Sequence, residues 1–299
     1  MMRRHRSWGL TLVEVAVLVV VLGLLFAVVI PAFLVRSGSM AYRMTCGSNL
    51  CSIGKGMLIY ANDYDDEFPR AGGPGGSWSA RTPSWAGANR FEAYGIDPSG
   101  GAGGQASTSA SLYLLVKYGE VEPKALVCTT GEPKTKPFDP AGYRFRGRQL
   151  SDLWDFGPNP PQHVSYAYHM VYGSYALAST SEPGLAVAAD RNPWTDSPFA
   201  KARDFSKFTP GIAPFNGTTE QALSGNTLAH QGDGQNVLCL DSHVAFEKRS
   251  FCGVDDDNIY TSWDGQDKIR GRPAQFGSVP ADPNDSLLVN DPAVVAQNK

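Results

Sequence analysis

The feature that most constrains this chain is an uncharged run of 21 residues, Val15 to Val35, with the sequence VAVLVVVLGLLFAVVIPAFLV. A helix of about 20 apolar residues is long enough to span the hydrocarbon core of a bilayer. The nine residues at the start, MMRRHRSWG, contain three arginines and no acidic residue, a charge bias that keeps this end on the cytoplasmic side. The run therefore predicts a single-pass membrane segment with a cytoplasmic N-terminus.

Three interpretations of this N-terminus compete: a cleaved secretory signal, an uncleaved anchor, and a signal that is cleaved in front of the apolar run. A secretory signal needs a site of small residues after its apolar core, but here the run continues to Arg36. Glu14 argues against a plain anchor, because a carboxylate just inside an apolar segment costs several kcal/mol and is usually retained for a function. Cleavage in front of the run is therefore favoured.

The stretch from Gly9 to Glu14, GLTLVE, resembles the prepilin and pseudopilin processing motif of type IV pili and type II secretion systems. The resemblance implies that a prepilin peptidase cuts after Gly9 and methylates the new N-terminus, Leu10. It also implies that Glu14 pairs with the N-terminal amine of a neighbouring subunit during assembly, which offsets the cost of burying both charges. Leu10 departs from the family pattern, in which phenylalanine usually follows the glycine. Pro31 lies where such helices commonly carry a proline.

An amphipathic helix is expected to follow the apolar run, because buried-type residues recur at helical spacing from Cys46 to Tyr60. Pro31 should bend the helix, and Pro69 should mark its end. The block from Cys46 to Pro69 resembles the segment after the anchor in a large group of bacterial pseudopilin-like proteins.

The remaining sequence predicts an α+β fold. A long N-terminal hydrophobic helix, the pilin spine, would precede a loop-rich globular domain with an antiparallel β-sheet. Alternating apolar residues predict four strands, at 164–168, 185–189, 236–240 and 243–246. The expected segments are a leader (1–9), a transmembrane and assembly helix (10–35), its amphipathic continuation (36–69), a flexible Gly/Ser-rich insertion (70–111), the β-rich domain (112–279) and a flexible tail (280–299).

A tight hairpin turn is predicted between the last two of these strands. The similar proteins usually carry Asp-Gly in this turn, about ten residues after a histidine, and here His230 and Asp241 occupy those places. Ser242 replaces the glycine, which implies a mild backbone cost or another turn type. Upstream, Thr129 and Thr130 follow Cys128 where the similar proteins often have Cys-Pro-Ser.

Two groups of residues have the chemistry of metal ligands. The first combines imidazole and carboxylate groups: His230, Asp233, Asp241 and His243. The alternative is that His230 and Asp241 form a hydrogen bond across the hairpin and fix its register. The second group offers the oxygen ligands that calcium prefers, without EF-hand spacing: Asp255, Asp256, Asp257 and Asn258, with Asp264 and Asp267 downstream. The resemblance supports calcium there, since pseudopilins sometimes bind it near the C-terminus; the alternative is a solvated acidic turn.

The five cysteines show no zinc-knuckle or redox-motif spacing. Cys46 and Cys51 lie five positions apart, about 500° around a helix, so they should not pair with each other. Cys239 and Cys252 flank the last predicted strand, which suggests a bridge between them.

The sequence predicts a structural subunit and not an enzyme. It contains none of the common nucleophile, phosphate-binding, dinucleotide or zinc-protease motifs, and a net charge of −3 disfavours nucleic acid as a partner. The resemblance implies four partners: the prepilin peptidase, other copies or pilin-like subunits, a secretion or pilus assembly platform, and the membrane. The protein would lie in the bacterial inner membrane with its C-terminal domain outside the cytoplasm, and then in a fibre. The alternative is a surface-anchored hydrolase or binding domain that uses a prepilin signal only for export.

Overall fold

The computed structural model describes residues 11–99, 103–128, 134–143, 147–211 and 219–293, with the backbone alone for residues 28–39. The chain divides into two compact units, Met1–Tyr42 and Arg43–Lys299. The predicted processing site, Gly9 and Leu10, lies outside the described residues.

Helix α1 (Leu12–Asp63) begins in the first unit and ends in the second. A capping box starts it: the Thr11 hydroxyl accepts from the Glu14 backbone N–H at 3.3 Å, and Glu14 Oε2 accepts from the Thr11 backbone N–H at 2.8 Å. The backbone stays helical through Pro31, and the helix ends before Pro69, as the sequence predicted.

The prediction of a membrane-spanning spine is wrong. Within the described part of the chain, no helix combines the length and the apolar character that crossing a bilayer requires. This finding overturns the spine in the predicted fold, the transmembrane and single-pass assignment of residues 10–35, and the inner-membrane location.

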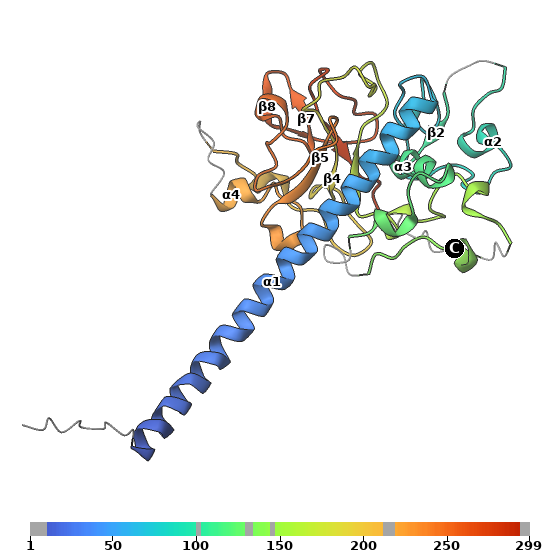
Figure 1. The fold of residues 1–299 in the computed structure, drawn as a ribbon. Coiled ribbons are helices and arrows are strands. Elements are labelled where there is room, and N and C mark those ends of the chain that lie inside the picture. The colour runs from blue at the N-terminus through green and yellow to red at the C-terminus, as the bar shows by residue number, and fades with distance from the viewer. Residues whose placement is uncertain (1–10, 100–102, 129–133, 144–146, 212–218, 294–299) are drawn as a thin grey trace, which may run out of the picture. The chain divides into compact units, whose positions relative to one another are not determined.

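The second unit is α+β and is built around a five-stranded antiparallel sheet in the order β6-β5-β4-β3-β9. Figure 1 labels two of these strands, β4 and β5. The strands of this sheet are β3 (Tyr166–His169), β4 (Ala186–Asp190), β5 (Gln235–Cys239), β6 (Val244–Glu247) and β9 (Leu288–Val289). The first four of these confirm the strands expected from apolar alternation. The sequence did not predict β9, which comes from the expected tail.

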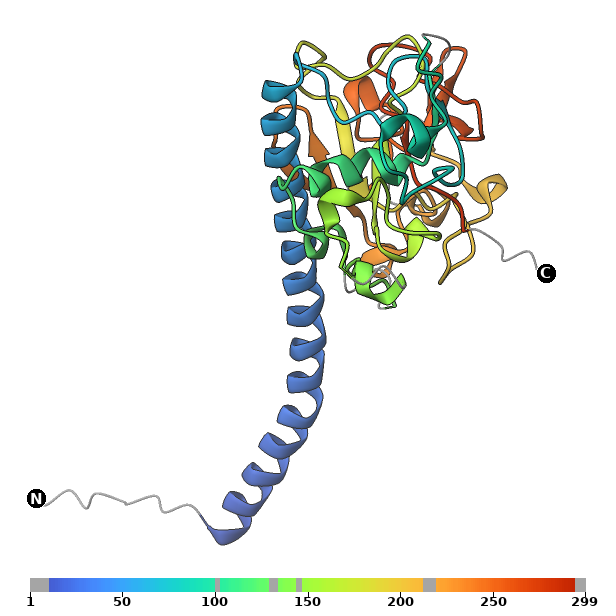
Figure 2. The ribbon, with the colours of Figure 1, turned by 90° about the vertical axis from the view of Figure 1, so that its right-hand side faces the viewer.

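Residues 43–63 of α1 run along one side of this unit (Figure 2). Their apolar face is buried in the main core, with Leu50 and Ile53 at 0% exposure. Gly54 permits close packing on the sheet, since a Cβ atom there would lie 2.9 Å from Cδ1 of Leu238 on β5. The 3.6-residue periodicity therefore identified the buried face correctly.

The described residues of the Gly/Ser-rich insertion, 70–99 and 103–111, contain regular secondary structure, and their flexibility stays a prediction. They form α2 (Arg90–Tyr94), the parallel pair β1 (Ser77–Trp78) and β2 (Gln105–Ala106), and the start of α3 (Thr108–Lys117). Glycine serves packing here: a Cβ atom on Gly103 would lie 2.2 Å from the backbone nitrogen of Gly76. Two backbone segments approach each other more closely than any side chain would allow.

The segment expected to be a flexible tail also contributes to the body: β9 pairs with β3, and Asp285 and Asp291 are buried. Flexibility of residues 280–299 stays a prediction. The other regular elements among the described residues are α4 (Glu220–Leu223), the hairpin of β7 (Thr261–Asp264) and β8 (Asp267–Pro273), and the 3-10 turns η1 (Pro123–Leu126), η2 (Pro140–Tyr143), η3 (Leu150–Asp152), η4 (Pro160–Gln162), η5 (Phe205–Lys207), η6 (Ala229–Gly232) and η7 (Val254–Asp256).

Candidate functional site

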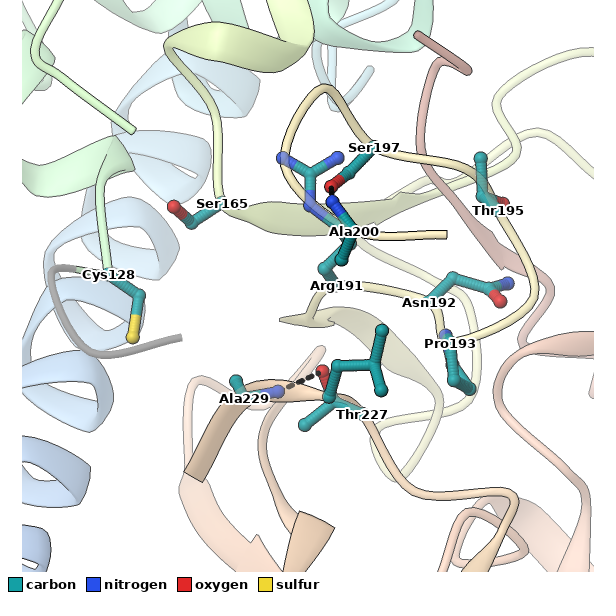
Figure 3. Close-up of a pocket in the computed structure, with 11 residues that line it drawn as sticks. Cys128, Ser165, Arg191, Asn192, Pro193, Thr195, Ser197, Ala200, Thr227 and Ala229 are labelled. Carbon is teal, nitrogen blue, oxygen red and sulfur yellow. Dashed lines mark hydrogen bonds between the residues drawn. The ribbon is translucent and has the colours of Figure 1, made fainter. Parts of the chain in front are cut away.

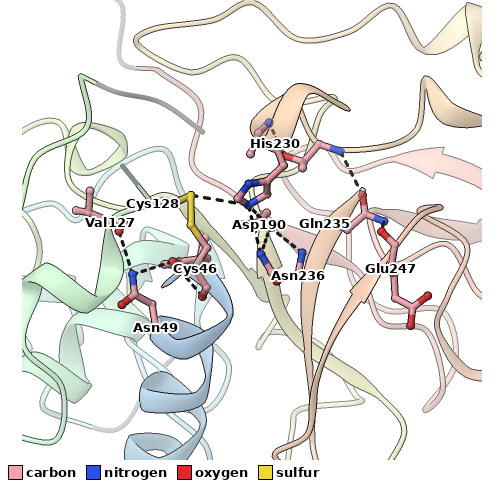
Figure 4. A network of polar contacts seen from close by, with 12 residues as sticks. Cys46, Asn49, Val127, Cys128, Asp190, His230, Gln235, Asn236 and Glu247 are labelled. Atoms are coloured by element: carbon pink, nitrogen blue, oxygen red, sulfur yellow. Dashed lines mark hydrogen bonds and ion pairs between the residues drawn. A yellow bond between two sulfur atoms is a disulfide. The ribbon is translucent and has the colours of Figure 1, made fainter. Parts of the chain in front are cut away.

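A disulfide links Cys46 on α1 to Cys128, which lies two residues after the end of η1 (Figure 4). The two Cα atoms lie 5.5 Å apart, and both side chains are buried. Asn49, one turn along α1, donates from its amide to the Val127 carbonyl at 3.1 Å and to the Tyr166 hydroxyl at 3.1 Å. The disulfide is thus held in place by polar contacts on the same helical face.

His230 approaches this disulfide from η6. Its Nε2 atom lies 3.9 Å from the Sγ atom of Cys128 and 3.2 Å from Oδ2 of Asp190. The backbone of His230 and Gln231 is left-handed, with φ of 53° and 65°, a conformation that non-glycine residues rarely adopt. Such strain persists where the surrounding contacts hold it, and it places the His230 ring inside the protein.

Asp190 ends β4, and the neighbouring strand β5 positions its carboxylate. Oδ2 accepts from the backbone N–H of Asn236 at 2.7 Å and from the side-chain amide of Asn236 at 3.0 Å. Oδ1 is buried and has no hydrogen-bond partner among the described residues. One oxygen of this carboxylate is therefore fixed, and the other is left unsatisfied in the interior.

The two cysteines of the disulfide, His230 and Asp190 form the one convergent group of potential metal ligands among the described residues. Their donor atoms all lie within 4.8 Å of one another, and all four residues are buried: Cys46, Cys128, Asp190 and His230. We call this group the Cys–His–Asp centre. Thiolate, imidazole and carboxylate together are typical zinc ligands, whereas a disulfide sulfur is a poor one.

Arg43 lies one turn before Cys46 on α1 and forms an ion pair with Asp233. Its guanidinium also stacks over the ring of Phe246 on β6, 4.4 Å from the ring centroid, and that ring meets His230 edge-on at 6.0 Å. The loop that carries His230 is therefore tied to the same helix as Cys46.

A small surface pocket lies beside Cys128 (Figure 3). Two of its polar side chains contact nearby backbone: the Arg191 guanidinium donates to the carbonyls of Pro161 and Val164, and the Ser197 hydroxyl accepts from Ala200 N–H at 2.9 Å. The hydroxyl of Ser165, which also lines the pocket, is buried and has no hydrogen-bond partner among the described residues.

The structure separates the residues of the first predicted metal group. His230 and Asp241 both lie in the described part of the chain and form no hydrogen bond with each other. The prediction of a hydrogen bond between them across the hairpin is therefore wrong. Asp241 instead accepts from Nδ1 of His243 at 2.6 Å in the exposed turn, and Asp233 pairs with Arg43. The spacing of these residues in the sequence could not show that they lie apart. The left-handed backbone at His230 turns its ring toward β4 and away from the hairpin turn.

The acidic group near the C-terminus is likewise spread over different environments. Asp255 pairs with Lys268 at 3.1 Å and Asp256 with Arg249 at 3.4 Å, both at the surface. Asp257 is buried, where it accepts from the Trp263 indole, and burial raises its pKa to about 7. Asn258, also buried, donates to the Ile269 carbonyl at 3.1 Å. These side chains do not converge on one point, and calcium binding here stays a prediction.

Sequence reasoning missed Asp190, Asn236 and the pairing of Cys46 with Cys128, which long-range packing alone brings together. Cys239 and Cys252 are free, so the suggested bridge between them is wrong. Glu14 also has a local role that the sequence could have indicated, because Thr11-Leu-Val-Glu14 is the Thr-x-x-Glu pattern of a capping box.

Comparison of the chain with family models, with curated proteins and with solved structures finds no match.

Proposed function

We propose that this chain is a structural subunit of a pilin-like fibre, either a type II secretion pseudopilus or a type IV pilus. It is processed after Gly9 and assembles through residues 12–27 of α1. The observation that carries the proposal is the surface of this segment.

Twelve large apolar side chains between Leu12 and Phe26 are 43–86% exposed in the single chain. They follow one another so closely along the helix that they cover every side of it. A helix that is apolar all round is stable in water only when other apolar surface covers it. Equivalent segments of neighbouring copies offer such a surface, and helix-on-helix packing lets them cover one another.

Glu14 gives this packing its register. It is the only charged residue in residues 12–27, so a bundle of these segments contains a carboxylate without a basic residue of its own to pair with. The α-amine that cleavage creates at Leu10 is the complementary charge. Glu14 pairs with this amine on a neighbouring copy, and a shift of register along the bundle would separate the two charges.

The first experiment determines the N-terminus of the protein isolated from its native cell by intact-mass spectrometry. The expected chain begins at Leu10, with the additional mass of one methyl group on its amine. A chain that still begins at Met1 would contradict processing.

The second experiment compares assembly of the processed wild-type protein with that of Glu14→Gln, by sedimentation and electron microscopy. Glutamine retains the capping box with Thr11 and removes only the charge. We expect wild type to form fibres and Glu14→Gln to remain largely unassembled. Asp63→Asn, an exposed acidic position at the other end of α1, is the matched control and should assemble like wild type. A processed wild-type chain that stays monomeric would leave only an export role for the signal.

A further inference from the structure

We propose that reduction of the disulfide converts the Cys–His–Asp centre into a zinc-binding site. Its four ligands are the buried side chains that already converge there: Cys46, Cys128, Asp190 and His230. The inference does not depend on fibre assembly, because all four residues belong to the body of the protein.

The ligand set matches zinc in number and chemistry. Structural zinc sites are four-coordinate and tetrahedral, and they use thiolate sulfur, imidazole nitrogen and carboxylate oxygen at about 2.0–2.3 Å from the metal. In such a tetrahedron neighbouring donor atoms are about 3.3–3.8 Å apart. The donor atoms here lie within 4.8 Å of one another, so only small side-chain movements separate the present arrangement from a closed site.

The unsatisfied oxygen of Asp190 is a second, independent observation. A buried carboxylate oxygen without a partner carries a free-energy penalty, yet Oδ1 of Asp190 has no partner among the described residues. Oδ2 meanwhile accepts two hydrogen bonds from Asn236, which fix the orientation of the carboxylate. Partners of this kind orient metal ligands. The oxygen that they fix, Oδ2, is the one that lies 3.2 Å from Nε2 of His230, and the unpartnered Oδ1 leaves this carboxylate with acceptor capacity that no described residue uses.

The imidazole is also placed for coordination. Nε2 of His230 faces both the sulfur of Cys128 at 3.9 Å and the carboxylate of Asp190 at 3.2 Å. It therefore already points to the space between the other ligands, at the cost of a left-handed backbone at His230.

The redox step is a thiol–disulfide exchange with a small-molecule dithiol. The S–S bond of Cys46–Cys128 breaks, each sulfur gains one electron and one proton, and the dithiol is oxidised to its own disulfide. Zinc then replaces the two thiol protons, which leave to solvent. Exchange with a small-molecule disulfide reverses the step: the two thiolates leave the metal and form the Cys46–Cys128 bond, the small-molecule disulfide takes up two electrons and two protons to become two thiols, and the zinc ion is released.

The test measures zinc binding to the full chain in its oxidised and reduced states. The protein is reduced with a dithiol, freed of reductant under nitrogen, and titrated with Zn²⁺ against a chromophoric chelator. We expect one zinc ion per reduced chain and none per oxidised chain. Co²⁺ in place of zinc should give the intense visible bands of a tetrahedral site and thiolate-to-metal charge transfer in the near ultraviolet.

Variants identify the ligands. Cys46→Ser combined with Cys128→Ser should abolish binding, and His230→Gln or Asp190→Asn should weaken it by about 100-fold or more. Cys51→Ser and His243→Gln are matched controls, because these residues lie on the same helix and in the same hairpin region but outside the centre. Both controls should bind zinc like wild type.

Three outcomes would overturn the proposal. These are equal zinc binding by the oxidised and reduced chains, no binding by either chain, and thiolate–cobalt bands that persist in the double cysteine variant. The comparison of oxidised with reduced wild type needs no substitution, so it decides the question even where a variant fails to fold.

Discussion

Oδ2 of Asp291 accepts a hydrogen bond at 2.8 Å from the backbone N–H of Ser109, 182 positions earlier in the chain. Oδ1 of the same carboxylate accepts from the Thr108 N–H and from the Trp78 indole, each at 2.8 Å. A residue near the C-terminus thus caps the N-terminus of α3, and it joins two segments that sequence composition had marked as flexible.

Replacement of Asp291 by alanine should destabilise the protein by about 2 kcal/mol or more. The loss of a helix cap costs about 0.5–2 kcal/mol, and the indole N–H of Trp78 would lose its partner as well. Urea unfolding at neutral pH measures the change. Asp291→Asn keeps an acceptor oxygen and should lose less, whereas Asp139→Ala, in an exposed turn, should change stability by under about 0.5 kcal/mol. Equal losses in Asp291→Ala and Asp139→Ala would exclude a capping role.

Removal of the Cys46–Cys128 disulfide should cost up to about 4–5 kcal/mol. The bond closes a loop of 82 residues, and loop-closure entropy predicts a stabilisation of this size for that length. Metal-free unfolding of the Cys46→Ser and Cys128→Ser double variant, with chelator present, measures the loss. Cys51→Ser should stay near wild type. A double variant as stable as wild type would show that the unfolded chain gains no freedom when the bond is absent.

Gly54→Ala should destabilise the body by about 1 kcal/mol. Alanine gains about 1 kcal/mol in helix propensity, but its Cβ atom would lie 2.9 Å from Leu238 Cδ1, and overpacking costs about 1–3 kcal/mol. Thermal unfolding is the measurement. In a Leu238→Val background, Gly54→Ala should lower the free energy of unfolding by less. An equal decrease in both backgrounds would show that contact with Leu238 is not the cause of the destabilisation.

Ser242→Gly should raise the free energy of unfolding by up to about 1 kcal/mol. Ser242 has a φ of 71° in the turn between β5 and β6, where a Cβ atom is unfavourable and glycine is not. Ser242→Ala keeps the Cβ atom and should give no gain. If alanine stabilises as much as glycine, backbone strain at this position is not the cause.

Asp155→Asn should remove a pH-dependent loss of folding stability that the buried Asp155 carboxyl causes in the wild type. Burial raises the pKa of Asp155 to about 7, although the hydroxyl groups of Ser107 and Thr82 donate to its carboxylate. The folded state therefore holds a proton that the unfolded state has released between about pH 4 and pH 7, and the contribution of this group to stability falls as the pH rises through that window.

Urea unfolding of wild type and Asp155→Asn at pH 5 and pH 8 isolates this contribution. The stability of wild type relative to the variant should decrease from pH 5 to pH 8, by at most about 1.4 kcal/mol per pH unit. Asp139→Asn supplies the comparison for an exposed carboxylate. A difference between wild type and Asp155→Asn that is independent of pH would mean that Asp155 is ionised throughout.

Local patterns in the sequence were sufficient for several elements. The spacing from Cys46 to Tyr60 identified the face of α1 that is buried, and alternation identified β3, β4, β5 and β6, because these periods depend only on local backbone geometry. Composition was a poorer guide. The glycines at 76 and 103 indicated flexibility, yet they permit two backbone segments to pack against each other.

The sequence by itself determined the helix α1, the strands β3, β4, β5 and β6, the turn at Ser242 and the apolar character of residues 12–27. Tertiary structure decided the rest: the pairing of Cys46 with Cys128, the placement of Asp190 beside His230, and the capping of α3 by Asp291. The physical reason is the range of the interactions. Periodicity and turn preference act over a few neighbouring residues, whereas the Cys–His–Asp centre depends on contacts between residues up to 184 positions apart, from Cys46 to His230. Only the folded chain brings those side chains within reach of one another.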